Sequence, residues 1–201
     1  MNRAGRLTAS GAIIAALLVG GAAIVGTAPA NDGVLAPFAA TAVIGEPVSA
    51  REFDAVVHGV SLTKTVNAEY SLTSSTVTSP GYWVVVDLTM TAHAEAATLS
   101  FAQLRVGDYS YSVSDFAPAP SLVGYSFGSD VPVRGPLVFE LPASAFESPD
   151  AADATLVLPA RQSPVLDTVP TIELDLASLV DGAAETVTID SASTPDAGGA
   201  E

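Results

Sequence analysis

Apolar and polar residues alternate in several short stretches of the chain, with the two-residue period that is typical of β-strands buried on one face. In residues 82–92 the apolar positions that recur at every second residue are Val84, Val86, Leu88 and Met90. In residues 136–142 they are Leu137, Phe139 and Leu141. These two stretches predict central strands that turn one face to a core.

Two further patterns predict how strands bend and pair. In residues 51–63 the alternation changes phase at His58 and Gly59, which predicts a β-bulge at Gly59. In residues 104–111 the dipeptide Gly107-Asp108 predicts a two-residue hairpin turn. Shorter strands are expected at residues 154–158 and 171–176, with one helical turn between residues 143 and 152.

The other segments are expected to be irregular. Residues 66–81 are polar and predict a loop or a weak edge strand, and residues 116–135 predict a long loop with several prolines. Residues 179–201 are acidic and rich in small side chains, which predicts a disordered tail. About seven short strands without an amphipathic helix predict an all-β fold, an immunoglobulin-like β-sandwich over residues 43–178.

A long uncharged segment precedes this domain. Residues 7–31 contain no charged side chain, whereas Arg3 and Arg6 stand before them and Asp32 follows. An apolar run of about 20 residues can cross a bilayer, and flanking basic residues favour the cytoplasmic side. We therefore expect residues 1–30 to be a signal anchor, a single transmembrane helix with a cytoplasmic N-terminus. Residues 31–42 would then tether an extracytoplasmic domain.

Cleavage of the leader is the alternative. The small residues that end at Ala30 fit a signal-peptide cleavage site, and cutting there would release a secreted product that starts at Asn31. An apolar run longer than the usual core of a signal peptide favours retention in the cell membrane.

Composition narrows the class of partner. The chain has no cysteine, so it can form no disulfide and carry no lipid on a cysteine. From residue 31 onward it carries five basic and 22 acidic side chains, a net charge of −17. Such a surface repels nucleic acids and anionic lipid headgroups. Weak calcium binding by clustered carboxylates stays open, although no Asp-x-Asp-x-Asp-Gly loop is present.

Two of the strand sequences resemble a known family. The stretch Gly81–Met90 and the stretch Arg134–Pro142 resemble two strands of bacterial telokin-like, immunoglobulin-like extracellular domains of unknown function (the DUF4352 type). The opening at Ile44–Val48 is similar to that family's first strand. The leader and the acidic domain resemble actinobacterial members.

The resemblance covers residues 43–176, and the segment 92–97 departs from the family's polar turn. It implies an extracytoplasmic sandwich, and it brings no catalytic residue to carry over.

The residues suited to catalysis or metal binding form no recognisable set. His58 and His93 have no Gly-x-Ser-x-Gly elbow beside them, and two histidines without cysteine make a poor zinc site. Glu173 and Asp175 share a strand face, which is better explained as a solvated face than as a glycosidase pair. We therefore expect no enzyme activity, no cofactor and no bound metal.

Four side chains are candidates for binding a partner. Trp83 lies opposite the predicted core face of its strand, where it is either covered core or an exposed anchor. The others lie in the loop at residues 121–127 and either pack over the sandwich or bind a partner: Leu122, Tyr125 and Phe127.

The sequence thus favours a membrane-anchored extracytoplasmic module that binds a protein of the cell envelope or a transporter complex. A secreted enzyme or inhibitor and a purely structural envelope module are the alternatives.

Overall fold

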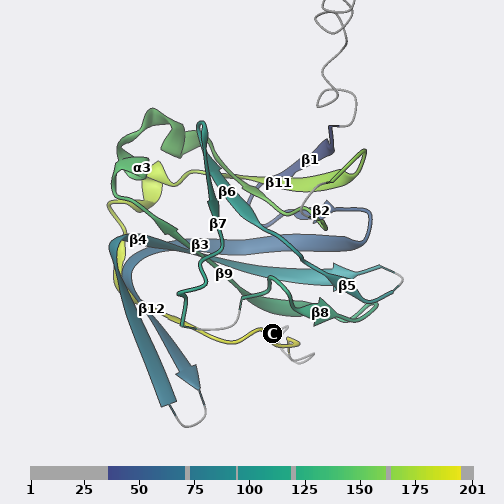
Figure 1. The fold of residues 1–201 in the computed structure, drawn as a ribbon, viewed down its shortest axis with the longest axis horizontal. Coiled ribbons are helices and arrows are strands. Elements are labelled where there is room, and N and C mark those ends of the chain that lie inside the picture. The colour runs from purple at the N-terminus through teal and green to yellow at the C-terminus, as the bar shows by residue number, and fades with distance from the viewer. Residues whose placement is uncertain (1–35, 71–72, 94, 119–120, 162–163, 196–201) are drawn as a thin grey trace, which may run out of the picture. The chain divides into compact units, whose positions relative to one another are not determined.

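Strands dominate the described part of the computed structural model, which comprises residues 36–70, 73–93, 95–118, 121–161 and 164–195 (Figure 1). The strands are β1 (Phe38–Ala42), β2 (Pro47–Ser49), β3 (Phe53–Tyr70), β4 (Thr73–Ala92), β5 (Ala97–Thr98), β6 (Gln103–Val106), β7 (Tyr109–Ser112), β8 (Ser126–Phe127), β9 (Val133–Leu141), β10 (Ala154–Val157), β11 (Thr168–Leu174) and β12 (Ala184–Ile189). Three helical turns accompany them: α3 (Ser144–Glu147), η1 (Pro149–Asp153) and η2 (Ala177–Leu179).

Two sheets enclose the main core. Sheet A has the strand order β1-β11-β10-β6-β7. Sheet B has the order β12-β3-β4-β9, with β2 also paired to β3. The alternating residues of β4 and β9 that were predicted to point inward all lie in this core, with Leu104, Leu156 and Ile172 of sheet A. The predicted all-β sandwich is therefore confirmed. The described residues form more strands than the expected seven or so, and several of these strands are short.

The predicted bend and turn are confirmed as well. The pairing of β3 with β4 shifts register between Val57 and Gly59, which is the predicted bulge. Strands β6 and β7 pair with Val106 opposite Tyr109, so Gly107 and Asp108 form the turn, and Gly107 adopts a φ of +55°. A positive φ strains most side chains but not glycine, which explains the residue at this position.

Of the two alternatives predicted for residues 66–81, the loop is wrong, because residues 66–70 and 73–81 belong to β3 and β4, and the edge strand holds for residues 73–78, whose described pairing is to β3. Both β3 and β4 continue beyond the sandwich as a long two-stranded arm, which we define as residues 63–70 and 73–78, and Figure 1 shows it turning away from the rest of sheet B. Polar side chains bond across the arm: Asn67 accepts a hydrogen bond from Thr76 (2.9 Å), and the hydroxyls of Thr65 and Thr78 are 3.1 Å apart. Cross-strand hydrogen bonds explain why a Ser- and Thr-rich segment forms strands.

The domain boundaries also differ from the prediction. Residues 38–42, assigned to the tether, form β1 and pair in parallel with β11. Residues 184–189, assigned to the disordered tail, form β12 and pair in parallel with β3. Strands β1 to β12 belong to one compact unit that begins at Pro37.

The predicted anchor at residues 1–30 lies outside the described residues, as do residues 31–35 of the predicted tether. In the part of the chain that the structure describes, no helix is long and apolar enough to cross a membrane.

Candidate functional site

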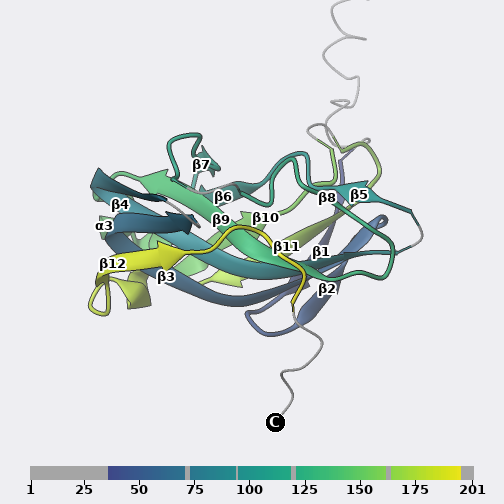
Figure 2. The ribbon, with the colours of Figure 1, turned by 90° about the horizontal axis from the view of Figure 1, so that it is seen from below.

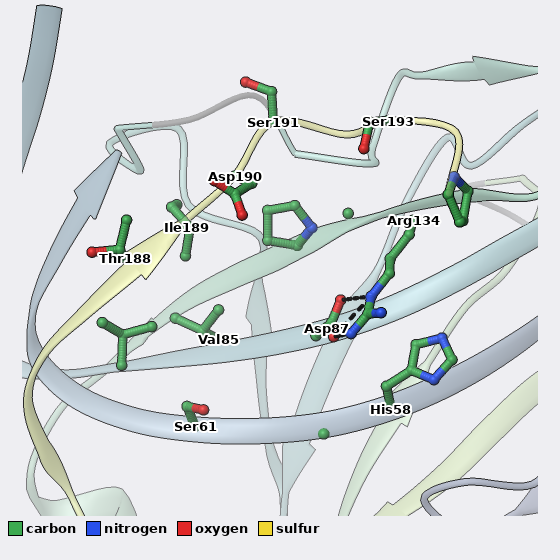
Figure 3. Close-up of a pocket in the computed structure, with 15 residues that line it drawn as sticks. His58, Ser61, Val85, Asp87, Arg134, Thr188, Ile189, Asp190, Ser191 and Ser193 are labelled. Atoms are coloured by element: carbon green, nitrogen blue, oxygen red, sulfur yellow. Dashed lines mark hydrogen bonds and ion pairs between the residues drawn. The ribbon is translucent and has the colours of Figure 1, made fainter. Parts of the chain in front are cut away.

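A groove of about 750 Å³ lies on the outer face of sheet B, the face turned away from sheet A (Figure 3). Strands β3, β4 and β9 form its floor, and β12 with the residues that follow it forms one wall. The side chains that line it most prominently are His58, Ser61, Val85, Asp87, Arg134, Thr188, Ile189 and Asp190.

An ion pair occupies the polar end of the groove. The Arg134 guanidinium of β9 donates to both carboxylate oxygens of Asp87 on β4, with its Nε 3.0 Å from Oδ1 and 3.1 Å from Oδ2. These hydrogen bonds raise the pKa of Arg134 above its usual value. Both side chains are about half exposed, so the pair contributes little to stability but sets the charge pattern of the groove.

The opposite end of the groove is apolar. Val85, Val187 and Ile189 line the groove and also belong to a second, smaller core on the outer face of sheet B. This outer core surrounds Trp83, which is only 1% exposed because the arm and β12 cover it. The groove therefore joins an apolar end to a charged end.

The C-terminal strap, which we define as residues 190–195, crosses sheet B from β12 to the edge of β9 (Figure 2). Ser193 exchanges two backbone hydrogen bonds with Arg134, with N···O distances of 2.8 and 2.9 Å. Ala192 packs against Gly135, where an added Cβ would lie 2.9 Å from the Ala192 Cβ. Glycine at 135 thus permits the close crossing that closes this side of the groove.

The edge of β9 is covered at three points along its length. Besides the strap at Arg134, the Leu122 N–H donates to Pro136 O (3.2 Å) and the Ser114 N–H donates to Val138 O (2.8 Å). Covering an edge strand in this way prevents another chain from pairing with it. The groove is consequently the accessible feature on this side, rather than the β9 edge.

The two histidines lie in different places. His58 lines the groove, and its Nε2 is 2.7 Å from the hydroxyl of Thr89. A hydroxyl bonded to an imidazole is a nucleophile–base pair, which also needs a carboxylate to orient the other ring nitrogen. Within the described residues, no carboxylate accepts a hydrogen bond from His58.

His93 belongs to an ion pair at the end of β4. Its Nε2 lies 2.9 Å from Asp54 Oδ1, and Ser49 donates to the same oxygen at 2.6 Å. The Ser49 and His93 hydrogen bonds lower the pKa of Asp54, and the bond to Asp54 raises the pKa of His93. Serine, aspartate and histidine meet here, but the aspartate stands between the other two, so the histidine cannot take the serine proton directly.

The structure corrects three of the four partner-binding candidates. Trp83, Leu122 and Phe127 are at most 1% exposed and belong to the cores, because the arm covers Trp83 and residues 122–127 pack over the sandwich. Tyr125 is 37% exposed and is the member of the set that solvent reaches. Glu173 points outward on β11 between buried neighbours, as its strand pattern predicted.

Sequence reasoning missed the residues that build the groove. Asp87 was visible as a polar position on the outer face of β4, but its pairing with Arg134 depends on the register between β4 and β9. Among the described residues, no group of three or more His, Cys, Asp or Glu side chains could hold a metal ion. The Trp83 Nε1 is buried without a hydrogen-bond partner among the residues that the structure describes, and nothing in this part of the chain explains it.

No protein-family model and no curated protein sequence match the chain. Several solved structures are similar to it. An uncharacterised β-sandwich protein from Clostridium difficile is 12% identical, with a TM-score of 0.46 over 66% of this chain and 93% of that protein. The secreted protein MPT63 of Mycobacterium tuberculosis is 15% identical, with a TM-score of 0.47 over 68% and 98%. The yjhA protein of Bacillus subtilis is 17% identical, with a TM-score of 0.43 over 65% and 99%.

Proposed function

We propose that this chain is a membrane-anchored, extracytoplasmic binding module of the telokin-like DUF4352 type that does not catalyse a reaction. Its uncharged N-terminal segment is the anchor, and the groove on sheet B is the contact site. The partner is a protein of the cell envelope, such as a transporter or an envelope-assembly complex in the same membrane.

The observation that carries this proposal is the composition of the groove. It joins the apolar end formed by Val85, Val187 and Ile189 to the Asp87–Arg134 ion pair, and these residues stand on paired strands. Apolar surface with a few fixed polar groups is typical of binding sites. Because strands hold the groove, a partner would meet a preformed surface and lose less entropy on binding.

The charges of the groove indicate the chemistry of the partner. Asp190 presents a carboxylate, whereas the Asp87 carboxylate is already bonded to Arg134, and the chain from residue 31 onward carries a net charge of −17. Such a surface attracts basic groups and speeds their encounter. The partner segment therefore has an aliphatic side chain for the apolar end of the groove and a neighbouring Lys or Arg for Asp190.

The bonding of the two histidines supports a non-catalytic role. His58 contacts a hydroxyl, and His93 contacts an aspartate whose serine neighbour is bonded to the aspartate instead of to the imidazole. Neither arrangement provides the hydroxyl–imidazole–carboxylate order that activates a nucleophile.

Site-specific photo-crosslinking in intact cells tests the proposal. A photoreactive amino acid at Ser61, an exposed groove residue, should give one dominant product in the membrane fraction. The same amino acid at Ser110, an exposed residue of β7 on sheet A, is the matched control and should not give that product. The crosslinked peptide should contain an aliphatic residue beside Lys or Arg, and Asp190→Lys should reduce its yield.

Other results would point elsewhere. Equal products at both positions, or a yield unchanged by Asp190→Lys, would exclude the groove as the contact site. A product in the medium that starts at Asn31 would favour the secreted enzyme or inhibitor. Full membrane retention without a crosslink at either position would favour a structural envelope module.

A further inference from the structure

An exposed apolar patch lies where the chain enters the sandwich. Phe38 is 63% exposed, and Val165 and Leu166 are each 56% exposed. The parallel pairing of β1 with β11 brings them together, because Phe38 pairs with Thr168 and the Phe38 N–H donates to Asp167 O at 2.8 Å. Both views show the start of β1 beside the loop that leads into β11 (Figures 1 and 2). We define this exposed patch as Phe38, Val165 and Leu166.

Backbone geometry sets Leu166 apart from an ordinary surface leucine. Its φ is +50°, a left-handed conformation that strains a non-glycine residue. Glycine or asparagine would adopt this conformation more easily. The loop instead places a large aliphatic side chain at an exposed, strained position. This side chain is not part of the sandwich core.

The patch also interrupts the acidic surface of the domain. Residues 33–45 and 164–166 contain no charged side chain, in a chain with 22 acidic residues. Asp167, which follows the patch, turns its carboxylate back to accept the Thr168 N–H at 2.9 Å. The repulsion that an acidic domain meets at a membrane surface is therefore reduced at this end.

In an anchored chain, only a short stretch of sequence would separate the patch from the bilayer. Only six residues separate Asn31, the end of the uncharged segment, from Phe38. Even fully extended, this stretch spans no more than about 25 Å. Aromatic and aliphatic side chains that can reach the membrane surface favour the headgroup region, because their apolar surface leaves water there.

We propose that Phe38, Val165 and Leu166 dip into the outer lipid interface and hold the domain against the membrane in a fixed orientation. This inference rests on the proposed membrane anchoring. Docking of the patch on the bilayer would leave the groove of sheet B free to face a neighbouring membrane protein.

The absence of cysteine makes a direct test possible, because one introduced cysteine gives a single labelling site. The full chain with Leu166→Cys, labelled with a polarity-sensitive fluorophore, is reconstituted into phosphatidylcholine vesicles. We expect a blue shift of the emission and strong quenching by lipids that carry a spin label near the headgroup. Phe116→Cys is the matched control, since Phe116 is 77% exposed and its neighbour Ala117 packs on the distant outer core.

The outcomes separate this inference from the proposed function. Phe38→Ser should reduce quenching at position 166 while the chain still floats with the vesicles. A floating chain whose position 166 stays in water would overturn the lipid contact alone. A blue shift that grows with protein density and resists lipid quenchers would replace it with contact between two copies. A chain that does not float with the vesicles would overturn both proposals.

Discussion

Gly81 lies so close to Leu141 that a β-carbon on residue 81 would be 2.0 Å from the Leu141 carbonyl oxygen. This contact lies at the corner between the part of β4 in the arm and the part that pairs with β9. The Lys64 ammonium donates to Gly81 O at 2.6 Å, and the Gly81 N–H donates to the hydroxyl of Ser79 at 2.9 Å. The corner is therefore fixed by sterics and by hydrogen bonds from both strands.

Gly81→Ala should destabilise the protein by at least about 2 kcal/mol, because the clash is with backbone that cannot rotate away. Urea unfolding measures the change. Gly59→Ala is the matched control, since a β-carbon there has no heavy atom within 4 Å. Equal stability of the two variants would show that the corner relaxes.

The contrast between these two glycines shows what the sequence could reveal. The bulge at Gly59 was predicted because the alternation of apolar and polar residues changes phase there, and this alternation can be seen in the sequence itself. The corner at Gly81 was missed, because the constraint comes from Leu141, far away in the chain. Strands β1 and β12 were missed for the same reason, because their parallel partners are remote in sequence.

Ile189→Ala should loosen the outer core and make Trp83 more accessible. Ile189 is 4% exposed beside Trp83 in that core, so truncation should cost about 2–4 kcal/mol. Because the chain has one tryptophan, its fluorescence reports on this core alone. We expect a red shift of the emission and faster acrylamide quenching. Val180→Ala, at a 37% exposed position, is the control and should leave both unchanged.

Gly135→Ala should release the strap without unfolding the sandwich. The new methyl group would meet both the Ala192 Cβ at 2.9 Å and the Leu122 side chain at 3.1 Å. Loss of the two backbone bonds between Arg134 and Ser193 should cost about 1–2 kcal/mol and expose residues 190–195 to proteases.

Limited proteolysis followed by mass spectrometry measures this release. Adding Ala192→Gly to Gly135→Ala removes one of the colliding methyl groups and should restore part of the protection. Unchanged cleavage in Gly135→Ala would mean that the strap does not depend on this close crossing.

The His93–Asp54 pair should make stability depend on pH in a defined window. The raised pKa of His93 adds stability that is fully present below its ordinary value of 6.5 and is lost as pH rises through the folded-state value. The lowered pKa of Asp54 adds stability present above its ordinary value of 3.8 and lost as pH falls through the folded-state value. Asp130 also favours the charged imidazole. The pair is therefore strongest between about pH 4 and 6.5.

Comparing the wild type with His93→Gln by urea unfolding at pH 5.5 and 8.5 checks this expectation. The difference between the two proteins should shrink at pH 8.5. In an Asp54→Asn background, His93→Gln should lose most of this pH dependence. A difference that grows with pH would contradict the direction of the His93 shift.

The groove was less predictable than the fold for a physical reason. A strand pattern states which face of one strand is buried, but it does not state which residues of neighbouring strands stand side by side. Asp87 and Arg134 meet only because β4 pairs with β9 in one register, with Arg134 opposite Thr89. A register shift by one residue would have separated them.

The position of β12 and the strap in the chain has a consequence for biogenesis. These segments come after all the other described strands in the chain, yet they complete the outer core around Trp83 and the edge of sheet B. During synthesis from the N-terminus, sheet B stays unfinished until they emerge. The edge of β3 that pairs with β12 therefore lacks its partner until residues 184–189 have been made, so the closing of the outer core around Trp83 is expected to be a late step of folding.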